Sequence, residues 1–164
     1  MLFFLGIVGG GYYNNPGSGS QYVCIPETAP QYLTVQGGVQ SNGAFMYGTE
    51  YYNVGGTLGS GLHYHDVPCA VCYVPSRGTE MMVPAQYTCP AGWTLEYYGY
   101  LMAEHYTHKH SSQFVCVDHK AEYRYGTHSR SSGAFMFPVE GRCGSLPCGP
   151  FVEGYELTCA VCTK

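Results

Sequence analysis

Short runs of β-branched and aromatic residues recur along this chain, separated by clusters of glycine, proline and serine. The clearest runs are QYVCI at 21–25, GAFMY at 43–47, CAVCYV at 69–74, QFVCV at 113–117 and GAFMF at 133–137. Such runs are typical of strands. No 3.6-residue periodicity extends over about 11 positions or more. The nearest candidate helix, AEHYTHKH at 103–110, has an aromatic and histidine content that favours strand or loop. We therefore expect an all-β fold.

The sequence also repeats itself. Leu2, Gly6 and Tyr13 correspond to Leu95, Gly99 and Tyr106 at an offset of 93, and Cys24 corresponds to Cys116 at 92. SNGAFMYGTEYYN from Ser41 corresponds to SSGAFMFPVEGRC from Ser131 at an offset of 90, which also places Cys69 on Cys159 and Cys72 on Cys162. Repeats of this size usually stack or interlock around a shared core. We expect two pseudo-symmetric copies, residues 1–75 and 76–164, that form one compact unit.

The repeat also bears on the N-terminus. LFFLGIVGG at 2–10 could pass for the apolar part of a leader, but it takes the place of LEYYGYLMA at 95–103. We interpret it as a core strand. The second copy opens earlier, with YTCPAGWT around Cys89, and the counterpart of that cysteine would lie just before Met1. We expect the sequence to start a few residues after a missing cysteine, which would account for an odd total.

Composition narrows the classes of function. Charged residues make up 11% of the chain and the net charge is -4, so we expect no nucleic-acid partner. No run of about 18 apolar residues occurs, so we expect no membrane span. A surface this poor in charge suits a protein that lives in an assembly. Nine cysteines favour a secreted, disulfide-bonded protein over an intracellular metal protein.

The pattern Cys-Ala-Val-Cys occurs twice, at 69–72 and 159–162, and three chemistries would explain it. A zinc ribbon needs both cysteines of a pair to face one ion, whereas residues i and i+3 of a strand point to opposite faces. A redox pair needs a helix N-terminus to lower the cysteine pKa, and only two residues follow Cys162. The pattern therefore favours disulfides to different partners on the two faces of a strand.

Taken together, the motifs resemble a known family. They are CPAGWTLEYYGYLM at 89–102, FVCV at 114–117, GAFMF at 133–137, RCGSLPC at 142–148 and CAVCTK at 159–164. They are similar to the duplicated non-collagenous C-terminal domain of type IV collagen, and closer still to the short-chain, spongin-type collagen relatives of invertebrates. The likeness runs from Leu2 to Lys164. It implies an all-β fold in which two copies exchange hairpins about a pseudo-twofold axis, and a role in trimerisation and network assembly. The chain departs from type IV collagen in having no Gly-X-Y tract, which it would need to form a triple helix.

The resemblance also implies a disulfide pairing, because each copy in that family bonds its six cysteines first to sixth, second to fifth and third to fourth. The implied pairs are Cys24–Cys69, Cys89–Cys162, Cys116–Cys159 and Cys143–Cys148. In this scheme the partner of Cys72 is the cysteine expected before Met1, so Cys72 is left unpaired here. The third and fourth positions of the first copy fall near Asn53 and Leu58, so that copy lacks one bridge and is expected to be looser.

The histidines gather in two clusters. HYHD supplies His63, His65 and Asp66, and HYTHKH supplies His105, His108 and His110. If these segments are strands, His63 and His65 share a face, as do His108 and His110. Such pairs suit a divalent transition metal, with Asp66 as an oxygen ligand. The alternative is that they are exposed histidines making ordinary hydrogen bonds. The first copy has Tyr12 and Asn15 in place of His105 and His108, so any such site occurs once.

Matched tyrosines suggest a glycan surface. They are Tyr12, Tyr13, Tyr97, Tyr98, Tyr100 and Tyr106. Aromatic faces stack on sugars, although packing in a β core with a bonded hydroxyl is the commoner role. No nucleophile elbow, phosphate loop or paired-carboxylate motif occurs, so we expect no enzyme and no cofactor.

The favoured hypothesis is a secreted structural domain for extracellular-matrix assembly, as a homo-oligomer or a hetero-oligomer with matrix proteins. The alternative is a secreted lectin-like or metal-binding module that uses the histidine and tyrosine clusters.

Overall fold

The computed structural model describes residues 2–128 and 130–164, so the first residue of the expected first copy, Met1, lies outside the described part. Its regular structure is nine strands and one short 3-10 helix, η1. The strands are β1 Leu2–Gly10, β2 Val23–Pro26, β3 Tyr47–Tyr51, β4 Pro68–Cys72, β5 Glu80–Pro84, β6 Thr94–Ala103, β7 Val115–Asp118, β8 Ala134–Pro138 and β9 Thr158–Thr163; η1 is Ser60–Leu62. The expected all-β class is confirmed. Within the described residues, no helix has the length and apolar character needed to span a bilayer.

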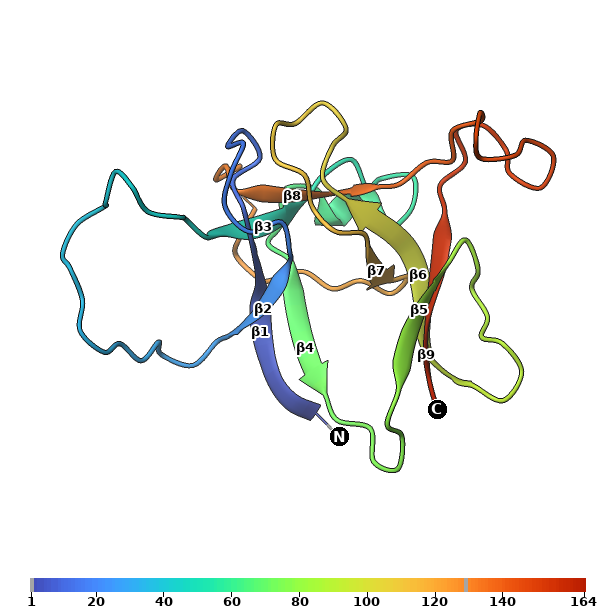
Figure 1. Cartoon of the computed structure of the whole chain (residues 1–164), viewed down its shortest axis with the longest axis horizontal. Coiled ribbons are helices and arrows are strands. Elements are labelled where there is room, and N and C mark those ends of the chain that lie inside the picture. The colour runs from blue at the N-terminus through green and yellow to red at the C-terminus, as the bar shows by residue number, and fades with distance from the viewer. Residues whose placement is uncertain (1, 129) are drawn as a thin grey trace.

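The strands form one sheet in the order β2-β1-β3-β8-β6-β9-β5, with β4 also paired to β1 and β7 also paired to β6. Each half of the chain builds its own antiparallel set around one long strand, β1 in the first half and β6 in the second (Figure 1). The two sets meet where β3 pairs with β8 in parallel. A parallel pair cannot be closed by a tight hairpin, so this contact joins segments that are far apart in sequence.

The pairings of β1 and β6 follow the same register. Gly6 lies opposite Cys69 and Gly99 lies opposite Cys159, in each case three residues after a bulge. Val8 pairs with Cys24, just as Leu101 pairs with Cys116. Gly10 pairs with Tyr47, just as Ala103 pairs with Phe137. Every one of these pairs is related by the offsets of 93, 92 and 90 seen in the sequence.

Four disulfides staple the sheet: Cys24–Cys69, Cys89–Cys162, Cys116–Cys159 and Cys143–Cys148. These are the four pairs that the collagen resemblance implies. Cys72 is free and exposed. In β9 the two cysteines bond to different segments, as expected for sulfurs on opposite faces of a strand. The first half has no bridge at residues 53–58; there the amides of Thr57, Leu58 and Gly59 donate to the Val54 carbonyl.

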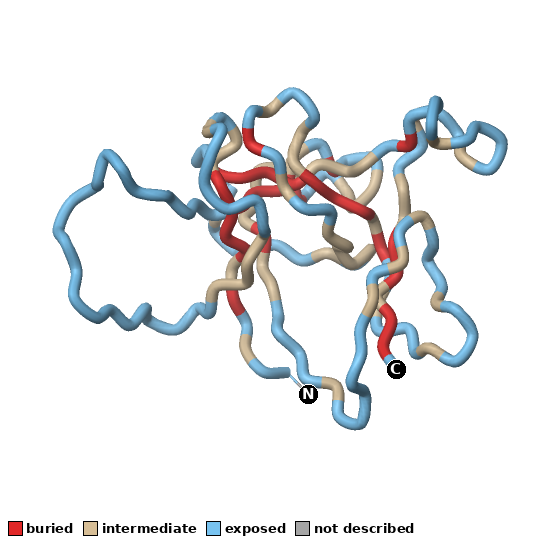
Figure 2. Tube along the Cα trace, in the orientation of Figure 1, coloured by how far each residue is buried: buried red, intermediate tan, exposed pale blue. Residues whose placement is uncertain are grey.

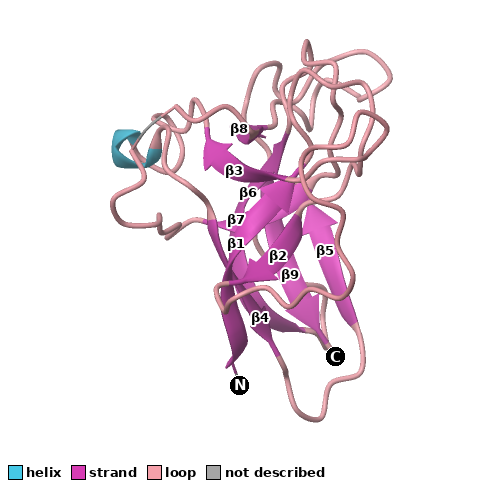
Figure 3. Cartoon of the chain, turned by 90° about the vertical axis from the view of Figure 1, so that its left-hand side faces the viewer, coloured by secondary structure: helices cyan, strands magenta, loops and turns pink. Residues whose placement is uncertain are grey.

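One hydrophobic core serves both halves. It consists of Val8, Tyr51, Val54, Leu62, Val67, Met102 and Met136. The first five come from the first half and the two methionines from the second. Buried stretches lie where the two sets of strands meet and along β9, while the ends of β1 and β4 extend into solvent (Figure 2). Both termini lie at that end of the molecule (Figure 3).

Two expectations about strands need correction. GAFMY at 43–47 is not a strand, because residues 41–46 form a turn and an extended segment without a ladder, and β3 begins only at Tyr47. The stretch LFFLGIVGG is a strand, but only its second part lies in the core: Phe3 is 73% exposed, whereas Val8 is 8% exposed.

Candidate functional site

The six residues predicted to bind metal do not gather at one place. His63 and His65 flank Tyr64, whose φ of 63° is left-handed, and the two rings have different contacts. His63 accepts a hydrogen bond at Nδ1 from the backbone N–H of Asn53, at 3.1 Å. The His65 ring packs on Tyr123, with centroids 4.2 Å apart. The expectation that His63 and His65 share a strand face is wrong, because neither residue lies on a strand.

Asp66 belongs to the contact between the two halves. Its backbone N–H donates to Thr127 Oγ1 at 3.2 Å, and its carbonyl accepts from the Arg124 N–H at 3.2 Å. Burial raises the pKa of the Asp66 carboxyl, and the positive charge of Arg124 partly opposes this. Glu50, which forms a β-bridge with Asp66, also has its pKa raised by burial, and the Ser131 N–H, 2.7 Å from its Oε1, opposes the shift.

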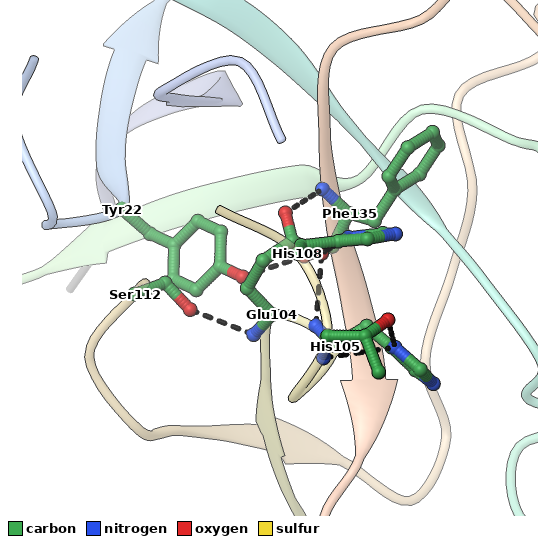
Figure 4. A network of polar contacts seen from close by, with 7 residues as sticks. Tyr22, Glu104, His105, His108, Ser112 and Phe135 are labelled. Carbon is green, nitrogen blue, oxygen red and sulfur yellow. Dashed lines mark hydrogen bonds and ion pairs between the residues drawn. The ribbon is translucent and has the colours of Figure 1, made fainter. Parts of the chain in front are cut away.

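His105 and His108 lie on the loop after β6, around the buried carboxylate of Glu104 (Figure 4). The His108 Nδ1 lies 2.7 Å from Glu104 Oε1. The same oxygen accepts from the His105 N–H at 3.0 Å, and Oε2 accepts from the Phe135 N–H at 3.0 Å. Because a carboxylate only accepts, the His108 proton is on Nδ1 and Nε2 is free to face a ligand.

His110 has a structural role. It is 5% exposed, its N–H donates to the Tyr13 carbonyl, and its Nε2 lies 3.1 Å from the Gly19 carbonyl oxygen. The ring lies directly over Gly11, where a Cβ would collide with it. His108 and His110 do not share a strand face as expected, since both lie in the loop.

The predicted metal site is not assembled in the part of the chain that the structure describes. There, no three ligand atoms drawn from the six predicted residues come within 4.8 Å of one another. One other group, Cys143, Cys148 and Glu153, meets that distance. Its two sulfurs are bonded to each other, so they are not thiolate ligands.

A different site forms between the two histidine clusters, at the junction of β3 and β8. It is an open cleft of about 210 Å³ lined by Tyr13, Tyr52, His105, Thr107, His108, Arg130, Phe135 and Phe137. Its aromatic walls are continuous: the Tyr52 ring lies 4.8 Å from Phe137 and 5.3 Å from Phe135, and Tyr13 lies 4.7 Å from His108. Sequence reasoning found the two histidines and Tyr13, but missed Glu104, Tyr52 and Arg130 because no motif brings them together.

The matched tyrosines do not form one glycan surface. Tyr13 lines the cleft, Tyr12 packs on Tyr47, and Tyr106 is 91% exposed on the loop. The Tyr97 hydroxyl donates to the Cys116 carbonyl at 3.1 Å, as expected for a tyrosine that packs in a β core. Tyr98 stacks on His119.

A second feature is the long loop between β2 and β3, which we call the arm and define as residues 28–46. Every residue of the arm is exposed and none is charged. Its large apolar side chains are Tyr32, Leu33, Val35, Val39, Phe45 and Met46, with exposures from 38% to 99%. The arm projects away from the sheet (Figure 1). The corresponding loop of the second half, residues 119–133, instead packs on the first half through Asp66, His65 and Glu50.

The junction between the halves pairs one strand from each half, and the equivalent segments elsewhere lack this pairing. Ala134, Phe135 and Met136 pair with Thr49, Glu50 and Tyr51, and all six are buried. The equivalent of Thr49–Tyr51 is the segment 139–141. It makes the same antiparallel contacts. The Leu157 N–H donates to the Val139 carbonyl, as the Val67 N–H donates to Thr49 in the first half. The Gly141 N–H donates to the Tyr155 carbonyl, as the Tyr51 N–H donates to His65. No described strand occupies its other edge, and Glu140 is exposed. We call this the open edge.

No model of a known protein family matches the chain, and no solved structure matches it.

Proposed function

We propose that this protein is a secreted, disulfide-bonded structural domain of the extracellular matrix that assembles by strand exchange between copies of itself. In this assembly the arm of one copy adds a strand to the open edge of the next. The observation that carries the proposal is the mismatch between the two halves: one chain has an exposed apolar arm and also an unpaired edge of the matching register.

Internal duplication is the first support. Matching registers around β1 and β6 are expected if one β unit was doubled, because the side-chain period of a strand makes a register hard to reproduce by chance. The order of the cysteines, which resembles the type IV collagen domain, points the same way.

Duplication then specifies the register of assembly. Adding 90 to Thr49, Glu50 and Tyr51 gives Val139, Glu140 and Gly141, and subtracting 90 from Ala134, Phe135 and Met136 gives Ala44, Phe45 and Met46. The parallel pair that joins the halves within one chain thus has a counterpart that only a second chain completes. Unpaired edges are templates for such strand addition.

Apolar burial supplies a driving force. Phe45 is 38% and Met46 is 61% exposed, while the equivalent Phe135 and Met136 are each 3% exposed. Burying a side chain of this size stabilises by about 1.5–3 kcal/mol. Ordering the arm opposes this gain, so we expect association that depends on concentration. A head-to-tail contact of this kind closes into a ring when its rotation permits.

The disulfides support the assignment to an oxidising compartment. Four bridges in one chain of this size are typical of secreted domains. Covalent staples together with self-assembly suit a role in the matrix. We extend the proposal to hetero-oligomers with matrix proteins that have an unpaired edge like the open edge.

The test is the mass of the protein in solution. Light scattering after size exclusion should give an oligomer at high protein concentration that dissociates on dilution. Phe45→Asp should be monomeric at every concentration, because the charge would be buried without a partner at the open edge.

The matched control is Tyr125→Asp, which changes a 91% exposed aromatic residue on the other loop and should assemble normally. A wild-type protein that stays monomeric at millimolar concentration would exclude the proposal. So would a Phe45→Asp variant that assembles like the wild type.

A further inference from the structure

We propose that the cleft at the β3–β8 junction binds one acidic sugar unit, a pyranose ring that carries a carboxylate or a sulfate. This site is independent of the assembly proposed above, because every lining residue belongs to the same chain. The shape of the cleft, its hydrogen-bonding groups and its arginine all suit such a ligand.

The walls are suited to a ring. Tyr52, Phe135 and Phe137 form one aromatic cluster, with neighbouring centroids between 4.8 and 6.3 Å apart. Tyr13 extends it on the Phe135 side at 5.3 Å. Aromatic side chains combine a large apolar face with a polar tip, and such walls accept the apolar face of a sugar ring while its hydroxyls point to the rim. A cavity of about 210 Å³ has room for one sugar ring and not for an extended chain.

The rim carries hydrogen-bonding groups of defined polarity. His105 Nδ1 accepts the Thr107 N–H at 3.3 Å and lies 2.8 Å from the Thr107 hydroxyl, so the neutral ring has its proton on Nε2 and donates into the cleft. His108, whose Nδ1–H is held by Glu104, has its Nε2 free, and in the neutral ring this nitrogen is an acceptor. The two imidazole rings are adjacent, with centroids 5.2 Å apart. A donor on one ring and an acceptor on the other match a pair of sugar hydroxyls.

Arg130 gives the cleft a group that binds anions. Arg130 is the one formally charged residue among those that line it. Glu104 lies beneath the floor with its side chain 2% exposed, and both its oxygens are occupied by donors. Glu50, the nearest carboxyl to Arg130 on β3, is buried and bonded to the Ser131 N–H. Arginine binds carboxylate and sulfate groups through paired N–H donors.

Among the residues that the structure describes, this set of side chains occurs once. The positions that correspond to Glu104, His105 and His108 are Gly11, Tyr12 and Asn15, so the first half has neither the buried carboxylate nor the imidazoles. Packing alone does not explain this set. At the equivalent position of the first half, the Tyr12 ring packs on Tyr47 with centroids 5.0 Å apart. His105 packs on Phe137 in the same way, at 4.8 Å, so this contact does not require a histidine.

Titration calorimetry with three oligosaccharides tests the proposal. A hyaluronan tetrasaccharide carries carboxylates only, a keratan-sulfate tetrasaccharide carries sulfates only, and tetra-N-acetylchitotetraose is neutral. We expect at least one acidic probe to bind and the neutral one to bind roughly tenfold more weakly or not at all, as expected for loss of one charged hydrogen bond. Which acidic probe binds identifies the anionic group that the cleft accepts.

Arg130→Gln should weaken binding of the acidic probe by roughly tenfold, while Arg124→Gln, on the same loop but outside the cleft, should leave it unchanged. Equal binding of neutral and acidic probes would overturn the proposal, as would wild-type affinity in Arg130→Gln or no binding of any probe. Repeating the titration with the Phe45→Asp variant separates the outcomes: this cleft should bind whether or not the chain assembles.

Discussion

The tetrapeptide Gly-Ala-Phe-Met occurs twice in this protein, and its two copies have opposite structures. At 133–136 it leads into β8, where Phe135 and Met136 are buried at the junction of the two halves. At 43–46 it ends the arm, where Phe45 and Met46 are exposed and form no strand. An identical local sequence therefore does not decide between strand and loop. Its surroundings do.

The surroundings differ in two side chains that hold Phe135. Glu104 accepts the Phe135 N–H, and the Tyr22 hydroxyl donates to the Phe135 carbonyl at 2.6 Å. The equivalent positions for Phe45 are Gly11 and Phe114, which offer neither an acceptor nor a donor. Because buried backbone groups need partners, the second copy is held in the core, while the first can leave it.

The bridges provide the largest test of the comparison between halves. Cys116–Cys159 and Cys24–Cys69 span 43 and 45 residues, so removing either should cost roughly 4 kcal/mol in the chain-entropy model. Cys159 is fully buried, whereas Cys69 is half-buried. We expect the double alanine variant of the second-half bridge to lose more stability, because it also leaves a cavity. Urea unfolding measures both, and a larger loss in the first half would contradict the interpretation.

The paired glycines provide the next test. A Cβ on Gly133 would collide with the Gly48 carbonyl oxygen, while the nearest atom to a Cβ on Gly43 is 3.6 Å away. Gly133→Ala should therefore destabilise by about 1–3 kcal/mol or more, and Gly43→Ala should leave the unfolding free energy of the monomer within about 0.5 kcal/mol.

The same pair also tests assembly. In the proposed oligomer Gly43 would lie against Pro138 of the next copy, as Gly133 lies against Gly48, so Gly43→Ala should weaken association. Unfolding at low concentration and light scattering at high concentration separate the two effects. Normal association of Gly43→Ala would argue against the proposed register.

A smaller effect concerns pH. Burial raises the pKa of Glu50 above its ordinary 4.5, so the folded protein binds that proton more tightly than the unfolded chain. Stability should fall as pH rises from 4.5 through the raised pKa, and the penalty persists above it. Glu50→Gln keeps the oxygen that accepts from Ser131 and should raise stability at neutral pH, with no gain below 4.5. The exposed counterpart, Glu140→Gln, is the control, and an equal gain there would contradict this account.

The smallest effect is expected at Cys72, the counterpart of Cys162. Within the described chain it is the free cysteine, and it is exposed. Cys72→Ser should change the unfolding free energy by no more than about 0.5 kcal/mol, whereas Cys162→Ser breaks the bridge to Cys89. Alkylation of the native protein followed by mass spectrometry should modify one thiol. Protection of Cys72 would show that it has a partner.

The sequence alone was sufficient for the all-β class and for the strands around Cys24, Cys69, Cys116 and Cys159. β propensity, turn residues and matched spacing are local or pairwise properties, and they can be read from the chain. The resemblance to the collagen domain supplied the disulfide pairs, which spacing by itself leaves open.

Only the tertiary structure decided which Gly-Ala-Phe-Met segment is buried, and which residues meet at the cleft. Phe135 accepts a hydrogen bond from Tyr22 and donates one to Glu104, residues that lie 113 and 31 positions away. Likewise, the loop after β6 brings His105 to Tyr52 through Phe137. These outcomes depend on contacts between distant segments, and the energy of such contacts is not encoded in any one stretch of residues.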